Sequence, residues 1–342
     1  LVPNCMDRPQ KVYKMYNPTE PYQLKIFDLE TTDKGRAAEI CQISAITQDG
    51  HTYSSYVLPK GNVSFGASRV NNLRVENING SRFLCKNSLP VVANSLENAL
   101  SSFSEFIKQH CCTIGKRFIP VRIGHNAAVF DVPILLRNTG KSYDQELEGL
   151  NVHSGDSLPL IKSLLQRKHT SLQLPNGVNC RANIGSIYRC LFHEDFDAHD
   201  AMEDVKALRK ILFSSELGID IEAIVNGSQI MSICDARSDL EFLDKRLDIL
   251  QTFEGNLFCP NSVDSTISKA MAEKIAGSGL SYENLSFVYQ TFSDAGIVGI
   301  LSGAHYCQRQ PQCPRYGGKT PRITNNKRIL NSILIYFQSK QK

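Results

Sequence analysis

Two carboxylates alternate along a short apolar segment near the beginning of the chain. Asp28 and Glu30 lie two residues apart at the end of the segment Gln23 to Leu29, which has the composition of a buried strand. Residues two apart in a strand project from the same face, so these side chains point together. Two facing carboxylates raise each other's pKa unless a cation lies between them. The pair therefore predicts either a site for a hard divalent ion or a strand end that emerges into solvent.

A third acid lies near the start of a predicted helix. The segment Pro120 to Ile123 has strand composition, and a helix is expected from about Asn126 to Arg137, with Asn126 as its N-cap. Asp131 then lies one turn into the helix, among apolar residues where an acid is unusual. It either belongs to a site or complements the positive end of the helix dipole.

A histidine and a fourth acid accompany the start of a later helix. Asp200 and Glu203 have the spacing of a helix N-cap and its partner, which predicts a helix from Asp200 to about Phe213. Asp204 then lies just inside this helix, and His199 occupies the loop residue before it. Such a histidine is well placed to take a proton from a metal-bound water. Considered alone, it also fits a surface or capping histidine.

The elements that carry these residues follow an order typical of an α/β domain. Three strand-like segments separated by tight turns predict an antiparallel meander, namely Gln23 to Leu29, Ile40 to Thr47 and His51 to Leu58. Helical spacing of apolar residues follows in Ser95 to His110 and in Leu158 to Leu165. Strands first, followed by helices that alternate with a strand, predict a mixed sheet flanked by helices.

In this order and on these elements, the acidic blocks resemble those of the DEDDh family of DnaQ-like 3′→5′ exonucleases, which have a ribonuclease H-like fold. The matching blocks are Phe27 to Thr32, Gly124 to Leu135 and His199 to Leu208. The resemblance covers roughly residues 22 to 213. It departs from the family pattern after Thr32, where Asp33-Lys34-Gly35 replaces the usual glycine and apolar residue, so this loop is longer or differently turned.

The resemblance implies a role for each side chain. Two Mg²⁺ ions, which Mn²⁺ can replace, would be held by Asp28, Glu30, Asp131 and Asp204. His199 would act as the general base. The residues implied to contact the substrate are Leu29, Thr31, Thr32 and Asn126.

The implied reaction is hydrolysis of DNA from its 3′ end, with single strands preferred, to nucleoside 5′-monophosphates. The same catalytic residues serve RNA equally well, because the ions contact phosphate and discrimination depends on the sugar 2′ position. An RNA 3′→5′ exonuclease is therefore an alternative. Another is a catalytically silent nucleic-acid- or protein-binding module on the same fold, although five intact positions argue against it.

The segment after about residue 216 has a different character. The sequence predicts a lead-in segment over 1–20, an exonuclease domain over 21–216 and a smaller, mainly helical domain over 217–342. The apolar-faced stretches of this smaller domain are Ser238 to Leu250, Val263 to Ile275 and the basic stretch Asn326 to Phe337. Within this domain, Met271 to Leu285 and Gly318 to Leu330 resemble the tail of PML-like exonucleases.

Basic residues gather near the end of the sequence, at Arg309, Arg315, Lys319, Arg322, Lys327, Arg328, Lys340 and Lys342. They predict either a solvated tail or a surface that holds a nucleic-acid strand through phosphate contacts, with Tyr306 and Tyr316 stacking on bases. His305, Cys307 and Cys313 lie close together but lack the paired cysteines of a standard zinc site. Reduced cysteines are the favoured interpretation.

Composition excludes several classes of protein. Of 342 residues, 42% are hydrophobic and 21% charged, which is typical of a globular chain rather than a disordered one. The net charge of +4 is too small to indicate a nucleic-acid partner by itself. Eleven scattered cysteines without a visible signal peptide predict a reducing intracellular location, nuclear or cytoplasmic. No apolar run approaches the ~18 residues of a membrane helix.

Overall fold

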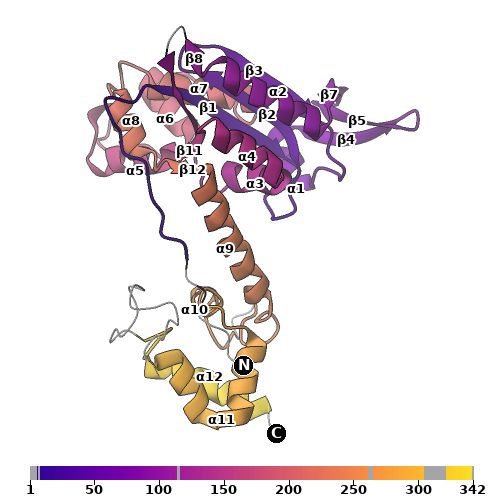
Figure 1. The fold of residues 1–342 in the computed structure, drawn as a ribbon, viewed down its shortest axis with the longest axis vertical. Coiled ribbons are helices and arrows are strands. Elements are labelled where there is room, and N and C mark those ends of the chain that lie inside the picture. The colour runs from indigo at the N-terminus through magenta and orange to yellow at the C-terminus, as the bar shows by residue number, and fades with distance from the viewer. Residues whose placement is uncertain (1–5, 7, 114–115, 261–264, 304–320, 341–342) are drawn as a thin grey trace. The chain divides into compact units, whose positions relative to one another are not determined.

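The computed structural model describes residues 6, 8–113, 116–260, 265–303 and 321–340 (Figure 1). The chain forms two compact units, one made of Lys11–Arg237 and the other of Leu1–Gln10 with Ser238–Lys342. These compact units divide after Arg237, and the domain boundary expected at 216/217 stays a prediction. The predicted lead-in segment is divided between them, because its later part pairs with the larger unit, as in the hydrogen bond from Lys14 N–H to the Ile230 carbonyl.

The larger unit is built on a seven-stranded mixed sheet with the order β12-β11-β10-β1-β2-β3-β7. The predicted antiparallel meander consists of β1 (Tyr22–Thr31), β2 (Ile40–Thr47) and β3 (Thr52–Val57). Parallel pairing adds β10 (Ile119–Gly124) beside β1 and β11 (His153–Asp156) beside β10. The edges are β7 (Ala93–Asn94) and β12 (Met231–Ser232). The expected α/β class, a mixed sheet flanked by helices, is confirmed.

Helices cover both faces of this sheet (Figure 1). They are α2 (Leu96–Gln109), α3 (Asp131–Asn138), α4 (Lys141–Gly149), α5 (Ser157–Gln166), α6 (Ile184–Phe192), α7 (Ala201–Leu212) and α8 (Ile221–Gly227), with a 3-10 turn at Thr170–Leu172. On one face, Val205 of α7 packs in a common cluster with Leu24 and Ile26 of β1. On the other, Tyr53 of β3 stacks on Phe103 of α2. The predicted helices at α2, α5 and α7 are confirmed, with small shifts at their ends.

The alternation along β1 decides where the first two acids point. Leu24 and Ile26 face α7 and are fully buried. Side chains two apart share a face, so Asp28 and Glu30 continue the same series toward α7. The pairing with β2 is irregular only after Glu30, between Glu30 and Thr31. Both acids therefore project onto the face that α7 covers.

A small second sheet follows β3 and was not predicted. It comprises β4 (Leu73–Ile78), β5 (Ser81–Lys86) and β6 (Leu89–Pro90), preceded by α1 (Phe65–Asn71). A separate two-stranded ribbon joins β8 (Cys112–Thr113) to β9 (Lys116–Arg117). The β4–β5 hairpin turns at Asn79 and Gly80, both with positive φ, which is the Asn-Gly signature of a tight hairpin. The sequence contained this signal, but the half-exposed strands lack a clear apolar alternation.

The smaller unit is mainly helical, as predicted. Its helices are the part of α9 (Ile233–Gln251) from Ser238 onward, α10 (Lys269–Ala276), α11 (Tyr282–Ser302) and α12 (Lys327–Lys340). Their apolar faces share one buried cluster. α10 begins later than the predicted Val263 because Ser268 caps it, accepting the Met271 N–H through its side chain. Among the described residues, no helix is both long enough and apolar enough to cross a membrane.

The cysteines whose side chains the structure describes carry free thiols, at Cys41, Cys85, Cys111, Cys180, Cys190, Cys234 and Cys259. Four of them, Cys41, Cys85, Cys111 and Cys180, are buried. The proposed alternative of a zinc site at His305, Cys307 and Cys313 falls outside the described residues, as do Tyr306 and Tyr316.

Candidate metal centre

Three carboxylates meet where β1 passes the start of α7. Asp28 and Glu30 project from β1, and Asp204 lies in the first turn of α7. One oxygen from each lies within 4.8 Å of the other two. In the described part of the chain, no other group of three or more His, Cys, Asp and Glu side chains gathers this closely. We call these three residues the carboxylate triad.

Asp131 lies beside the triad. It is the first residue of α3, is 2% exposed, and accepts a hydrogen bond from the Leu29 N–H at 3.2 Å. Among the charges that surround Asp28, that of Asp131 raises the Asp28 pKa the most. The structure therefore brings Asp131, the third predicted acid, next to Asp28.

The predicted N-cap at Asn126 is wrong. α3 begins at Asp131, and Asn126 has a φ of 63°, a left-handed conformation unlike the extended backbone of an N-cap. The loop before α3 is held instead by Asp156, whose carboxylate accepts the N–H of Asn126 at 2.8 Å and that of Ala128 at 3.2 Å. Asp156 lies far away in sequence, so local spacing could not reveal this contact.

Burial and mutual repulsion make these carboxylates difficult to ionise together. Burial is the largest cause for each, raising the pKa of Asp28 well above its usual range and that of Glu30 to about 8. It raises the pKa of Asp131 to about 7 and that of Asp204 to about 6. Neighbouring acids add to the shift, as Asp204 does for Glu30. A divalent cation would relieve this repulsion, and an all-oxygen donor set suits Mg²⁺ or Mn²⁺.

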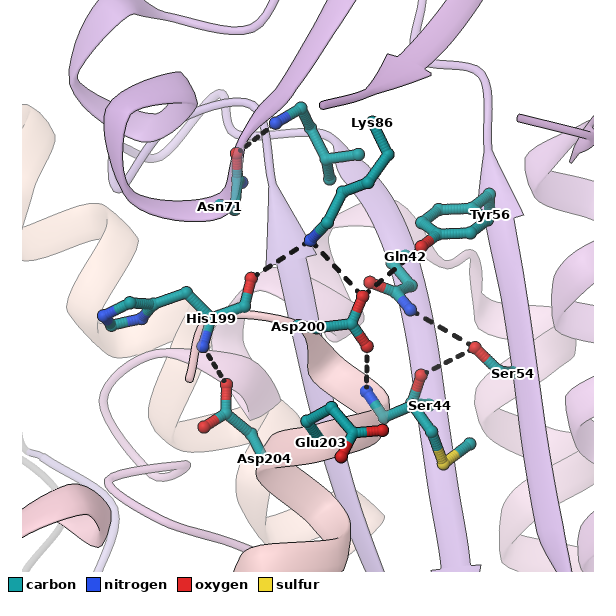
Figure 2. A network of polar contacts seen from close by, with 12 residues as sticks. Gln42, Ser44, Ser54, Tyr56, Asn71, Lys86, His199, Asp200, Glu203 and Asp204 are labelled. Carbon is teal, nitrogen blue, oxygen red and sulfur yellow. Dashed lines mark hydrogen bonds and ion pairs between the residues drawn. The ribbon is translucent and has the colours of Figure 1, made fainter. Parts of the chain in front are cut away.

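His199 is anchored to the triad through its backbone. Its N–H donates to Asp204 Oδ2 at 2.9 Å, while its exposed imidazole extends away from Asp200 and Lys86 (Figure 2). Its φ of 71° is left-handed. The predicted N-cap at Asp200 is confirmed, since its side chain accepts the Met202 N–H at 3.0 Å. Its expected capping partner, Glu203, pairs with Lys206 instead.

The residues predicted to contact substrate beside the first acids are largely buried. Leu29, Thr31 and Thr32 are 3%, 4% and 5% exposed. The Thr31 hydroxyl donates to the Asp33 carbonyl at 2.7 Å, and the Thr32 hydroxyl accepts the Glu39 N–H at 2.9 Å. These hydroxyls therefore shape the loop after β1. Their contact with a nucleotide, and that of the exposed Asn126, stays a prediction.

The structure adds residues that the sequence did not single out. Lys86 of β5 places its ammonium 3.3 Å from Asp200 Oδ2 and 3.3 Å from the His199 carbonyl oxygen (Figure 2). Asn71 donates from Nδ2 to the Thr31 carbonyl at 3.2 Å, at the end of β1. Burial alone would raise the pKa of Asp200, but the Lys86 charge and the Met202 amide outweigh it and lower this pKa.

The predicted basic surface near the end of the chain is described only in part. Lys327, Arg328 and Lys340 lie on α12. Arg322 donates to the Ser278 carbonyl at 2.8 Å and so takes part in the packing of the smaller unit. Arg309, Arg315, Lys319 and Lys342 fall outside the described residues. A strand-holding role for this surface stays a prediction.

Comparisons with known proteins give two kinds of match. Residues 264–340 match the family model of the PML C-terminal domain, a range that includes the stretches Met271 to Leu285 and Gly318 to Leu330 that resembled PML-like exonucleases in sequence. A search of curated proteins found no match.

Solved structures that match include the zinc-bound E. coli exonuclease I complex with single-stranded DNA (18% identity, TM-score 0.41, 66% of this chain and 43% of that chain). Another is E. coli exonuclease I with a dA16 oligonucleotide (17% identity, TM-score 0.39, 66% of this chain and 44% of that chain). A third is a structure of exonuclease I that suggests how processivity is achieved (14% identity, TM-score 0.42, 68% of this chain and 47% of that chain). The matches span less than half of the length of these exonuclease I chains.

The raised carboxyl pKa values predict how metal and pH together affect stability. An acid whose pKa is raised on folding contributes stability that is fully present below its unfolded pKa and is lost as pH rises through its folded pKa. For Glu30, this stability is lost over the pH window between its ordinary pKa of 4.5 and its raised pKa of about 8. We therefore expect Mg²⁺ to raise the unfolding temperature of the larger unit strongly near the upper end of this window and little near its lower end.

Differential scanning calorimetry at both ends of the window, with Mg²⁺ or with EDTA, measures this difference. Glu30→Gln is the matched comparison, because it removes one titrating carboxyl while keeping the shape of the side chain, and should flatten the pH dependence. An Mg²⁺ effect of equal size at both pH values would contradict the assignment of the triad as the metal site.

Proposed function

We propose that this chain is a metal-dependent 3′→5′ exonuclease that hydrolyses DNA, preferentially single-stranded, to nucleoside 5′-monophosphates. The observation that carries the proposal is the convergence of Asp28, Glu30 and Asp204, from two elements far apart in sequence, into one partly buried triad. Asp131 lies beside the triad and His199 at its margin. These five residues are also the ones that form the DEDDh pattern in the sequence.

The donor set fits a pair of Mg²⁺ or Mn²⁺ ions. Asp28, Glu30 and Asp204 would hold them, and Asp131 would complete the negative charge around Asp28. When bound, divalent ions supply positive charge to the phosphate and lower the pKa of an attacking water. Without that charge, the raised pKa values show that the acids resist ionising together.

His199 is the residue of this chain that moves a proton. Its imidazole would take a proton from the water as the water oxygen bonds to phosphorus. The bond from phosphorus to the 3′ oxygen then breaks, and this oxygen takes a proton from solvent water. The shortened strand is left with a 3′-hydroxyl, and a nucleoside 5′-monophosphate is released. The backbone bond to Asp204 keeps His199 next to the triad while its side chain extends outward. This backbone bond is the contact that supports His199 as the general base.

An exposed aromatic side chain next to the site supports a single-stranded substrate. Phe65 of α1 is 80% exposed, and the Arg69 guanidinium lies 5.8 Å from its ring. Ser64, which caps α1, donates its N–H to the Thr32 carbonyl at 2.8 Å. Phe65 is therefore close to the loop after β1, where an unpaired base could stack on it.

Labelled oligonucleotides test the proposal. With Mg²⁺, a 3′-labelled single strand should release labelled mononucleotide from the first time point, while a 5′-labelled strand should give a descending ladder. EDTA should stop both. Parallel reactions on duplex DNA and RNA assign the substrate, and faster hydrolysis of RNA would replace DNA with RNA in the proposal. Binding without any Mg²⁺-dependent hydrolysis would instead assign the chain to the silent binding modules.

A further inference from the structure

A lysine from the small sheet contacts the loop that carries His199. Lys86 is the last residue of β5, and its ammonium contacts both the His199 carbonyl and the Asp200 carboxylate, each at 3.3 Å (Figure 2). The ion pair is well shielded, because the Lys86 and Asp200 side chains are 15% and 19% exposed. The hydrogen bond to the His199 carbonyl joins two residues that are 113 apart in sequence. Such a pair is stronger than a pair in open solvent.

Asp200 connects this lysine to α7. One carboxylate oxygen caps the helix by accepting the Met202 N–H at 3.0 Å. The other receives the Tyr56 hydroxyl at 3.3 Å and the Lys86 ammonium (Figure 2). The residue that begins the helix bearing Asp204 is thus fixed from β3 and from β5.

Lys86 is itself held in place by contacts that lead back to β1. It precedes a tight turn at Asn87, whose φ is 52°. The Asn87 N–H donates to the Asn72 carbonyl at 3.1 Å. The neighbouring Asn71 donates to the Thr31 carbonyl. The ammonium is therefore positioned relative to the same strand that carries two acids of the triad.

The backbone of His199 needs such support. Its left-handed φ of 71° is unfavourable for a residue other than glycine and persists only when the surroundings hold it. Both polar groups of its backbone are engaged, the N–H by Asp204 and the carbonyl by Lys86. The strained residue is also the proposed general base.

We propose that Lys86 is a positioning residue, which holds the His199–Asp200 turn so that the imidazole stays directed at the water that attacks the phosphate; this rests on the proposed exonuclease function. Lys86 acts through His199 and does not itself need to touch the substrate. Tyr56, the other donor to Asp200, also helps to hold the His199–Asp200 turn. Its effect is smaller, because its hydroxyl carries no charge.

Steady-state kinetics on a single-stranded oligonucleotide with Mg²⁺ tests this role. Lys86→Met keeps the length and the apolar stem but removes the charge. We expect kcat to fall about 10- to 100-fold, as for other residues that orient catalytic groups. KM should change by less than about threefold, because ground-state binding is not affected. Lys86→Arg should restore much of kcat, since a guanidinium can donate to both oxygens.

A second substitution shows whether the effect passes through His199. Residues that act as a unit have non-additive effects. In a His199→Ala background, Lys86→Met should therefore lower kcat by less than about twofold further. Lys206→Met is the matched control, because it breaks a lysine ion pair with Glu203 on the same helix without contacting His199 or Asp200. It should leave both kinetic constants unchanged.

The possible outcomes distinguish a positioning role of Lys86 from other roles. Wild-type kcat in Lys86→Met, or a full-size effect in the His199→Ala background, overturns the inference. A raised KM with unchanged kcat and a weaker salt dependence of binding would assign Lys86 to phosphate contact and also overturns it. Loss of the Mg²⁺-dependent rise in unfolding temperature would show that Lys86 supports the triad instead. Absence of hydrolysis by the wild-type chain would contradict the proposed function, and with it the positioning role of Lys86.

Discussion

Replacing Asp28 with asparagine is expected to abolish hydrolysis of single-stranded DNA while leaving the chain folded. Burial raises the pKa of Asp28 well above its usual range, and the charges of Asp131, Asp204 and Glu30 raise it further. An amide of the same shape keeps the packing of β1 but removes a charged ligand. Since bound ions supply several kcal/mol of transition-state stabilisation, we expect a loss on the order of 10³-fold or more.

The same substitution should stabilise the metal-free protein. It removes a partly buried carboxyl group whose charge is repelled by three other acids. The unfolding temperature in EDTA should therefore rise, while the Mg²⁺-dependent rise should shrink. Initial rates of mononucleotide release and calorimetry measure the two effects on one sample. Asp195→Asn is the matched control, because Asp195 is 72% exposed and forms only a surface pair with Arg189. Full activity in Asp28→Asn would refute the metal site.

Removal of the His199 imidazole is expected to lower kcat by about 10²- to 10⁴-fold, the usual contribution of a general base. His199→Ala and His199→Asn should lose activity equally. Asparagine tolerates the left-handed backbone at this position, so equal losses would assign the effect to the imidazole rather than to a change in the turn.

The metal site should survive the loss of this imidazole. The bond from residue 199 to Asp204 is made by the backbone N–H, which both substitutions retain. The Mg²⁺-dependent rise in unfolding temperature should therefore match that of the wild type. His193→Asn is the matched control, since His193 is also exposed and left-handed, with a φ of 58°, but caps the end of α6. Activity of His199→Asn equal to that of His193→Asn would remove His199 from the mechanism.

Local sequence patterns were sufficient to predict the elements with strong apolar periodicity. β2 has the predicted ends, and α2 lies within the predicted Ser95 to His110. Alternation along β1 also predicted that Asp28 and Glu30 share a face. These predictions succeeded because each depends on residues within a few positions of one another, where burial imposes a period of two in strands and 3.6 in helices.

Other features depended on partners distant in sequence and were missed. The loop at Asn126 is held by Asp156, so the helix starts at Asp131 rather than at the residue with the best capping side chain. The small sheet that carries Lys86 has weak alternation.

The sequence alone was enough to identify the acidic side chains and the histidine, the strand that carries Asp28 and Glu30, and the capped helix start that carries Asp204, because these follow from short-range periodicity and capping. Only the tertiary structure decided that Asp28, Glu30 and Asp204 approach within 4.8 Å and that Lys86 contacts the turn before α7. Such approaches depend on strand order, register and the packing of α7 on β1. These are set by burial across the whole unit, so no local pattern of residues encodes them.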